Sequence, residues 1–311
     1  MRRLALLLAL VAAGCGPAGD DDGTLRTFDG DGRIRVVATI GMIGEAAERV
    51  AGERADVTSL MGPGVDPHVY KATEGDVIDL AGADLVLYNG LHLEAKLSDV
   101  LARIEGRTVA VTDGLPERRL LSPPEFAGLH DPHVWFDVGL WRLAVERVRD
   151  AFVELDPPRA AQYRRNAAAY LDELAELDTY VRRQAAREPA ERRVVITAHD
   201  AFNYLGRAYG FEVRGLQGIS TASEAGTGDI QELADFIAER RIPAVFVESS
   251  VSPRAIQAVR EAVRSRGWDV RIGEELFSDA MGTPGTPEGT YPGMVRHNID
   301  AIVSGLLAEE L

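Results

Sequence analysis

Cysteine is nearly absent from this sequence: Cys15 is the only one in 311 residues. A single cysteine excludes an internal disulfide framework and a zinc site built from several thiolates. A His-Glu-x-x-His stretch, which marks one class of zinc hydrolases, is missing as well. After the first residues, no apolar run is long enough to cross a membrane as a helix. Any metal site in this chain must therefore use histidine and carboxylate side chains.

Positive charge is also scarce. The chain has 34 Lys and Arg against 49 Asp and Glu, which gives a formal net charge of −15. Loss of Arg2 and Arg3 with a cleaved signal would take this charge to −17. Such an acidic protein lacks the basic patch that nucleic acid requires, so we expect no nucleic-acid partner. The charge is compatible with the attraction of cations.

The first residues are typical of an export signal. Met1-Arg2-Arg3 is basic, and residues 4–11 are apolar but too few to span a bilayer. The following Ala12-Ala13-Gly14-Cys15 resembles a bacterial lipobox, in which the signal is cut before a cysteine that then carries diacylglycerol. We expect a lipoprotein signal peptide over residues 1–14, lipidation of Cys15 and an extracytoplasmic, lipid-anchored protein; an ordinary signal with an incidental cysteine is the alternative.

Strand-like and helix-like segments alternate along the rest of the chain. Short apolar runs such as 35–40 and 55–61 are each followed by an amphipathic segment, which predicts a parallel sheet flanked by helices. Residues 159–187 contain no Gly or Pro and predict one helix of about 40 Å. Shorter helices are expected over residues 94–103 and 297–311. The strand-helix rhythm then restarts at residues 193–198. We therefore predict the α/β class, with two lobes joined by one long rigid helix.

The predicted domain organisation follows this pattern. Residues 15–32 are rich in Gly and Asp and are expected to form a flexible tether. The N-terminal α/β lobe is expected over residues 33–157, the linker helix over 158–190 and the C-terminal α/β lobe over 191–311.

Three of the six histidines occupy similar local positions. His68 and His133 each follow an Asp-Pro pair, and His199 lies where a strand gives way to a helix. Proline restricts the backbone and aspartate can hold a turn, so each imidazole is presented on a stiff segment. Loops that follow parallel strands meet at one edge of an open α/β sheet, where ligands bind. We expect these three side chains to face one cleft and to bind a metal ion.

A fourth ligand is expected from the second lobe, and Asp279 lies in its last long loop. Three imidazoles and one carboxylate suit Zn²⁺, and also Mn²⁺ if the carboxylate binds through both oxygens. Asp66 and Asp131 are interpreted as turn formers or as partners of the ligands. The other histidines, His92, His130 and His297, are expected to be surface residues.

Several motifs in the same order resemble the zinc/manganese solute-binding proteins of bacterial ABC transporters, over nearly all of the mature chain. The matching stretches are Gly64-Val65-Asp66-Pro67-His68, Tyr88-Asn89-Gly90-Leu91-His92-Leu93-Glu94, Asp131-Pro132-His133-Val134-Trp135, Thr197-Ala198-His199-Asp200-Ala201-Phe202, Phe246-Val247-Glu248-Ser249-Ser250 and Gly289-Thr290-Tyr291-Pro292-Gly293-Met294.

The resemblance implies two α/β lobes joined by a long helix, with a divalent metal held between them. It places the ligands at His68, His133, His199 and Asp279. Glu248 then becomes a candidate for supporting a ligand or packing the lobes.

The sequence is compatible with either zinc or manganese as the bound metal. Manganese-selective members of this family often have Glu at the third position, where this chain has His199. Many zinc-dedicated members carry a His-rich insertion before the second histidine, but residues 114–128 are short and contain no histidine.

The predicted function is extracytoplasmic capture of Zn²⁺ or Mn²⁺ and delivery to an ABC permease, by a monomer that is not an enzyme. Metal affinity is expected to fall as pH drops through about 6.5, the unperturbed imidazole pKa. Two alternatives are a binding protein for a chelated metal or haem, and a zinc-dependent hydrolase, which would need an open coordination position.

Overall fold

The computed structural model describes residues 28, 30, 32–104 and 106–307. The predicted signal peptide, Cys15 and most of the predicted tether lie outside these residues. Phe28 belongs to the predicted tether, yet it is packed against the folded chain: its N–H donates to the carbonyl of Leu155 at 2.6 Å, and the Arg54 guanidinium lies 5.2 Å from its ring centre.

The first lobe is built on a four-stranded parallel sheet in the order β2-β1-β3-β4. Its strands are short apolar runs that bury nearly every residue in β1 and β3. Helix α1 follows β1 directly, and Gly44 lets it approach β2, since a Cβ there would lie 2.1 Å from Ser59 Oγ. The elements are β1 (Ile34–Ile40), α1 (Gly41–Ala51), β2 (Ala55–Met61), α2 (Glu74–Gly82), β3 (Leu85–Tyr88), α3 (Ser98–Leu101) and β4 (Thr108–Ala110).

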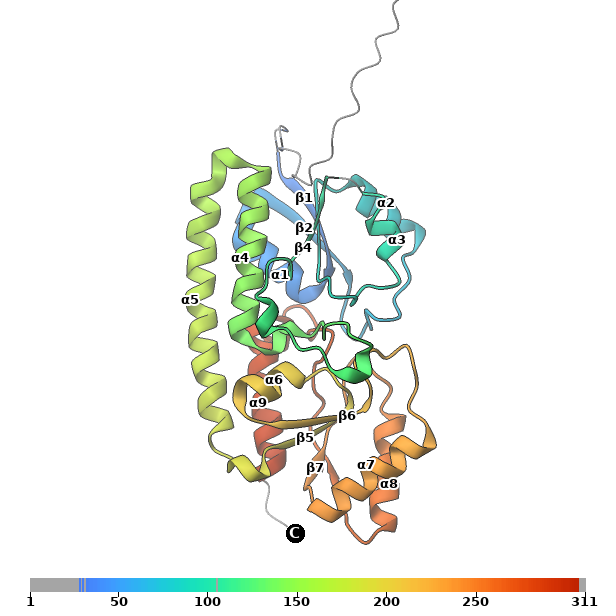
Figure 1. Ribbon diagram of the computed structural model, residues 1–311. Coiled ribbons are helices and arrows are strands. Elements are labelled where there is room, and N and C mark those ends of the chain that lie inside the picture. Colours follow the sequence, from blue (N-terminus) through green and yellow to red (C-terminus); the bar gives the residue numbers. More distant parts are fainter. Residues whose placement is uncertain (1–27, 29, 31, 105, 308–311) are drawn as a thin grey trace, which may run out of the picture.

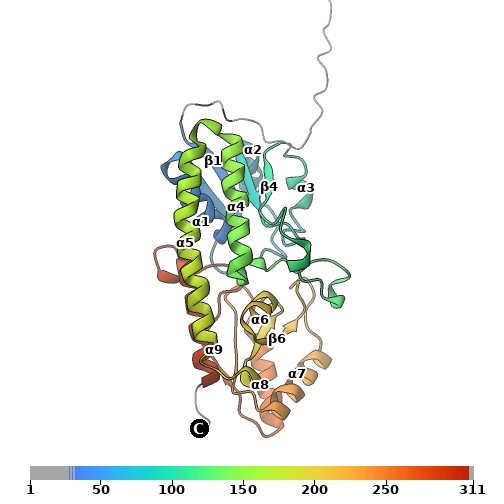
Figure 2. The ribbon, with the colours of Figure 1, turned by 60° about the vertical axis from the view of Figure 1, so that its left-hand side comes forward.

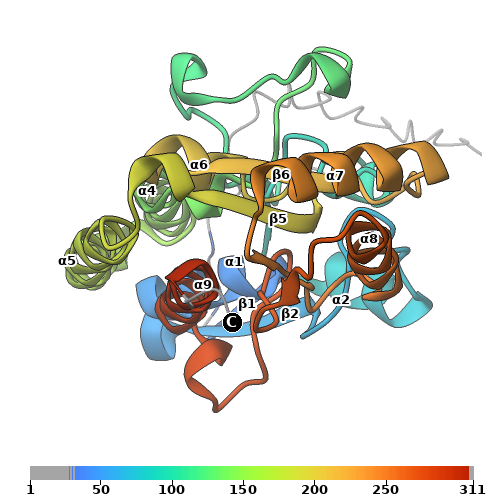
Figure 3. The ribbon, with the colours of Figure 1, turned by 90° about the horizontal axis from the view of Figure 1, so that it is seen from below.

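Two long helices follow the first sheet, and the second of them connects the lobes. Helix α4 (Val138–Leu155) begins with an Asp137 cap and belongs to the upper lobe of Figure 1. Helix α5 (Ala160–Ala185) then runs beside both lobes (Figures 1 and 2). Its buried residues recur every three or four positions, which makes one apolar stripe. Seen from below, α5 is the outermost element, with α4 and α9 between it and the sheets (Figure 3).

The second lobe repeats the alternation with shorter strands. Its parallel pairs are β5-β6 and β7-β8, and the Phe246 N–H donates to the Ile196 carbonyl at 2.8 Å to join them. The elements are β5 (Val194–His199), α6 (Asn203–Tyr209), β6 (Glu212–Gln217), α7 (Thr227–Arg240), β7 (Ala244–Val245), α8 (Arg254–Ser265), β8 (Arg271–Ile272) and α9 (Tyr291–Leu307). The predicted α/β architecture, with two lobes and one long helix, is confirmed.

Two predicted helices have different bounds in the structure. The segment 94–103 forms an α-helix only over Ser98–Leu101. The buried Glu94 carboxylate accepts the backbone N–H groups of Asn89 and Gly90. The last helix starts at Tyr291 rather than His297. Pro292 fits in the first turn, where a backbone N–H has no helical partner, so it does not delay the helix.

The larger hydrophobic core runs from the first lobe through α4, α5 and α9 into the second lobe. A smaller core lies among β5, β7, α7 and α8. In the described part of the chain, no helix combines the length and the apolar character that a membrane span needs.

Candidate metal centre

His68 and His133 are held by the same local device. Each N–H donates to the carboxylate two residues earlier, at 2.9 Å to Asp66 and 3.0 Å to Asp131. This aspartate turn fixes the backbone at the histidine, and the intervening proline stiffens it. His68 lies in the loop after β2, and His133 lies between β4 and α4. Both imidazoles therefore come from the first lobe.

The second lobe supplies His199 and Asp279. His199 is the last residue of β5, at the carboxyl end of a parallel pair, and Asp279 lies in the loop between β8 and α9. That loop is bound to the first lobe, because the Trp135 indole N–H donates to the Ser278 carbonyl at 3.0 Å. The Tyr291 hydroxyl donates to the Trp135 carbonyl at 2.7 Å. These bonds bring the two halves of the site together.

The four predicted ligands converge in one buried cluster. Each offers one ligand atom, and these atoms lie within 4.8 Å of one another. None of the four residues is more than 3 % exposed. Asp279 Oδ1 lies 3.3 Å from His133 Nε2, and Oδ2 lies 3.3 Å from His199 Nε2. His68 Nε2 lies 3.3 Å from His133 Nε2 and 4.0 Å from Asp279 Oδ2.

These separations fit a small divalent cation. Ligand atoms about 2.0–2.1 Å from a zinc ion stand roughly 3.3 Å apart at the corners of a tetrahedron. The buried His199 Nε2 and Asp279 Oδ1 make no well-aligned hydrogen bond among the described residues, and face Asp279 Oδ2 and His133 Nε2 at 3.3 Å. A buried polar atom without such a partner is costly, and a bound cation would satisfy it.

Two of the three imidazoles are oriented by a carboxylate behind them. His133 Nδ1 lies 2.7 Å from Asp131 Oδ1, and His199 Nδ1 lies 2.6 Å from Glu248 Oε2. Glu248 is itself fixed, because its Oε1 accepts the N–H groups of Ala198 and His199 at 2.7 and 2.9 Å. A carboxylate on Nδ1 places the proton there and leaves Nε2 free to bind a metal.

The carboxylates also control protonation. Burial opposes the charge on His133, but Asp131 and then Asp279 raise its pKa to about 9. Burial also opposes the charge on His199, while Glu248 and Asp279 raise its pKa well above the usual value. The same two histidines hold the pKa of Asp279 well below its ordinary range, despite its burial.

His68 differs from the other two imidazoles. Within the described chain no carboxylate lies on its Nδ1, and burial lowers its pKa to about 3. Asp66, which precedes it, turns its second oxygen to the Thr221 hydroxyl of the second lobe at 2.5 Å. Asp66 thus holds the His68 loop and also joins the two lobes.

The remaining histidines lie outside this cluster. His130 lies 2.7 Å from Ser122 Oγ and 3.0 Å from Glu117 Oε1, and His297 Nε2 lies 2.8 Å from the Glu275 carbonyl. His92 is exposed and lines a separate cavity with His130.

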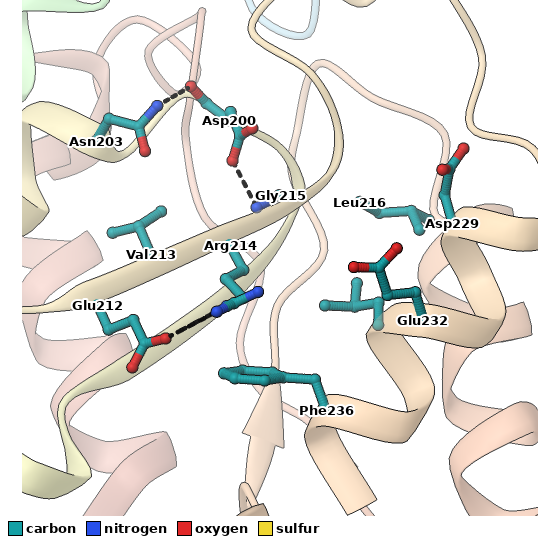
Figure 4. Close-up of a pocket in the computed structure, with 11 residues that line it drawn as sticks. Asp200, Asn203, Glu212, Val213, Arg214, Gly215, Leu216, Asp229, Glu232 and Phe236 are labelled. Atoms are coloured by element: carbon teal, nitrogen blue, oxygen red, sulfur yellow. Dashed lines mark hydrogen bonds and ion pairs between the residues drawn. The ribbon is translucent and has the colours of Figure 1, made fainter. Parts of the chain in front are cut away.

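A further cavity of about 430 Å³ lies between β6 and α7 (Figure 4). Asp200 points to the Gly215 N–H at 2.6 Å, and Arg214 faces Glu212. None of the four predicted ligands lines this cavity. It is therefore not the metal centre, although Asp200 directly follows His199.

Comparison with known families now identifies the chain. The family described as zinc-uptake complex component A, periplasmic, matches residues 36–305. The protein belongs to this family. Its members are the extracytoplasmic zinc/manganese solute-binding proteins of bacterial ABC transporters, a family of substrate-binding proteins, as the sequence motifs predicted.

Individual members of the family are similar over most of the chain. The zinc-binding protein TroA of Treponema pallidum (strain Nichols) is 54 % identical over 280 residues, which cover 89 % of this chain and 90 % of that protein. The manganese-binding lipoprotein MntA of Bacillus subtilis (strain 168) is 49 % identical over 278 residues, with 89 % and 90 % covered. The iron-binding protein YfeA of Yersinia pestis is 31 % identical over 274 residues, with 88 % and 86 % covered.

Solved structures of family members share the fold. The periplasmic zinc-binding protein TroA from Treponema pallidum superposes with a TM-score of 0.86 over 88 % of this chain and 99 % of that one, at 54 % identity. A manganese-bound mutant of the periplasmic metal-binding protein from candidatus liberibacter asiaticus gives a TM-score of 0.79 at 26 % identity, over 88 % and 100 %.

Sequence reasoning missed several residues that support the cluster of this family member. Asn203 donates to Asp131 Oδ2 at 3.1 Å, and Ser250 reaches Asp279 Oδ2 at 3.4 Å. The Ser249-Ser250 pair directly follows Glu248, and this position beside a candidate site residue is the signal that the sequence offers. No comparable pattern marks Asn203, because its contact crosses between the lobes.

Proposed function

We propose that this protein captures Zn²⁺ and/or Mn²⁺ outside the cytoplasm and delivers the ion to its ABC permease. The ligands are His68, His133, His199 and Asp279. The observation that carries this proposal is the convergence of four buried side chains, two from each lobe, at separations that suit one divalent cation.

Zinc and manganese both fit the donor set. Three imidazole nitrogens and one carboxylate oxygen make a four-coordinate site of the kind that zinc prefers. Both oxygens of Asp279 face histidines, so the carboxylate can also add a fifth ligand atom, which suits manganese. Relatives named for zinc and for manganese are similarly close to this chain, at 54 % and 49 % identity.

The organisation of the mature protein belongs to the same proposal. A lipid on Cys15 anchors a monomer at the membrane, and residues 15–32 form the tether between this anchor and the first lobe. The lobes span residues 33–157 and 191–311, and residues 158–190 form the connection. Helix α5 lies within that connection and packs along both lobes, which supports modest lobe movement.

A purely binding role, without catalysis, accounts for the site better than the two alternatives. A zinc hydrolase needs a coordination position open to water, whereas four protein ligands close this buried site. Haem or a chelated metal needs a roomy cavity beside the ligands. The cavity of Figure 4 and the one beside His92 and His130 contain none of the four ligands.

The first test is the metal content of protein purified without chelator, followed by competitive titration of the stripped protein with Zn²⁺ and Mn²⁺. Stoichiometric, tight binding of either ion supports the proposal. Tight zinc that manganese cannot displace makes the protein a zinc receptor, and comparable binding of both makes it a dual one. No stoichiometric ion would overturn the proposal, and haem titration would follow.

A matched pair of variants tests the ligand assignment. His133→Ala is expected to weaken binding of both ions at least about 100-fold, because it removes a ligand and leaves Asp131 and Asp279 without their shared partner. His92→Ala removes an exposed imidazole outside the cluster and should leave both affinities unchanged. Equal effects of the two substitutions would refute the assignment.

A further inference from the structure

The Asp279 carboxylate can bind a metal in two ways. Its Oδ1 faces His133 and its Oδ2 faces His199, each at 3.3 Å. One oxygen with three imidazoles completes a four-coordinate site, while two oxygens make a five-coordinate one. Zinc sites favour four ligands, and manganese favours more oxygen ligands. The orientation of this carboxylate therefore affects which metal the site prefers.

Two hydroxyls act on one of these oxygens only. Ser250 Oγ lies 3.4 Å from Asp279 Oδ2 and 2.8 Å from Ser278 Oγ. An ionised carboxylate can only accept, so the Ser250 proton points to Oδ2. Ser278, which is fully buried, then donates its own proton to Ser250. The result is a chain of hydrogen bonds from Ser278 through Ser250 to Oδ2, whereas Oδ1 faces the His133 imidazole and receives no hydrogen bond from a hydroxyl group among the described residues.

The turn that carries Ser250 is itself rigidly placed. Glu248, two residues earlier, holds His199 through a 2.6 Å contact. The Ser249 N–H donates to the Leu276 carbonyl at 2.9 Å, which fixes the turn against the segment that leads to Asp279. One turn, residues 248–250, therefore orients both ligands of the second lobe.

We propose that Ser250 is a positioning residue that sets metal preference: its hydroxyl, backed by Ser278, holds Asp279 Oδ2 so that the carboxylate binds the ion through a single oxygen. This inference rests on the proposed function of the cluster. The hydrogen bond reduces the electron density that Oδ2 can offer a metal and resists rotation of the carboxylate. Ser250 thereby favours four-coordinate zinc over manganese.

Ser250→Ala tests the proposal in the full-length protein stripped of metal. Zn²⁺ affinity should fall about tenfold, in the range seen when supporting partners of metal ligands are removed, while Mn²⁺ affinity should change less than about threefold. Ser250→Thr keeps the hydroxyl and should retain the wild-type ratio of Zn²⁺ affinity to Mn²⁺ affinity. Ser249→Ala is the matched control, because the buried Ser249 hydroxyl makes no hydrogen bond among the described residues.

The absorption spectrum of bound Co²⁺ reports the coordination number of the metal independently of its affinity. Its visible absorption is intense when four-coordinate and weaker with a fifth ligand atom, so Ser250→Ala should weaken it and Ser249→Ala should not. An unchanged zinc-to-manganese ratio in Ser250→Ala, or equal losses in both alanine variants, would overturn the inference. A wild-type protein that binds neither ion would instead overturn the proposed function, and the inference with it.

Discussion

Two carboxylates behind the imidazoles govern the chemistry of individual residues in this site. Asp131 and Glu248 each lie within 2.7 Å of an Nδ1 atom, on His133 and His199. Both histidines consequently have raised pKa values, which differs from the unperturbed value near 6.5 expected from sequence. The difference arises because the carboxylate contacts outweigh the cost of burying the charge.

Metal binding should therefore release protons at neutral pH. With a pKa of about 9, His133 is protonated at pH 7 before the ion binds, and His199 has a pKa raised in the same direction. A metal ion must displace these protons, so apparent affinity rises with pH until pH passes about 9. We expect a rise of about 10- to 100-fold per pH unit near neutrality, for one or two protons released. Calorimetry in buffers of different ionisation enthalpy measures the proton count, and a count of zero at pH 7 would contradict this prediction.

Asp131→Asn tests the effect of the negative charge at this position, because the substitution removes the charge and keeps the shape of the side chain. The amide keeps an oxygen for the His133 N–H and Nδ1, but the negative charge is lost. The pKa of His133 should fall, and metal affinity should drop about 10- to 100-fold. Titration of the His133 ring by nuclear magnetic resonance and competitive metal binding measure both effects. Asp66→Asn is the control, since Asp66 contacts the His68 backbone rather than its ring nitrogens; an equal loss there would argue against a role for the Asp131 charge.

At the scale of elements, α5 depends on one buried stripe. Leu174 and Leu177 are fully buried on it, whereas Glu176 between them is exposed. Because the helix packs on α1, α4 and α9 from one side, its stability comes from this stripe and not from its polar face.

Leu174→Ala should lower the free energy of unfolding by about 2–5 kcal/mol, through lost burial and the cavity left behind. Glu176→Ala should change it by no more than about 0.5 kcal/mol. Urea unfolding of the metal-free variants measures both values. Similar midpoints for the two variants would show that the stripe does not hold the helix in place.

At the scale of the whole molecule, protein side chains join the two lobes, and a bound ion would add to these contacts. Each lobe contributes two ligands, and contacts such as Trp135 to Ser278 and Thr221 to Asp66 already cross between them. A ligand that binds only the folded, assembled site stabilises the whole molecule by mass action.

Zn²⁺ at about 1,000 times its dissociation constant should stabilise the protein by about 4 kcal/mol and raise Tm accordingly. Thermal unfolding with and without zinc measures the shift, and a chelator should reverse it. His133→Ala should lose most of the shift, while His92→Ala should keep it. A similar shift in both variants would mean that zinc stabilises the protein through some other site.

The sequence by itself determined much of this protein. Strand-helix alternation, the unbroken helix near residues 159–187 and the two Asp-Pro-His turns are local patterns, and local patterns follow from backbone restriction and apolar periodicity. The motif resemblance then named the family and the four residues that converge in the structure. Local signals gave wrong bounds for the helix expected over residues 94–103, which forms only over Ser98–Leu101. At its start, the buried Glu94 carboxylate accepts the hydroxyl of Thr39, 55 positions earlier, a contact that no local pattern indicates.

Only the tertiary structure decided how the site is supported and protonated. Ser250 and Asn203 reach Asp279 and Asp131 across 29 and 72 positions of the chain, and no spacing in the sequence predicts such a contact. The raised pKa of His133 likewise depends on two carboxylates, Asp131 at 2.7 Å and Asp279 at 3.3 Å, whose effect outweighs that of burial. Two of the candidate ligands, His68 and His133, sit in Asp-Pro-His turns that the sequence shows directly. The partners of the cluster are brought to it by the packing of the two lobes.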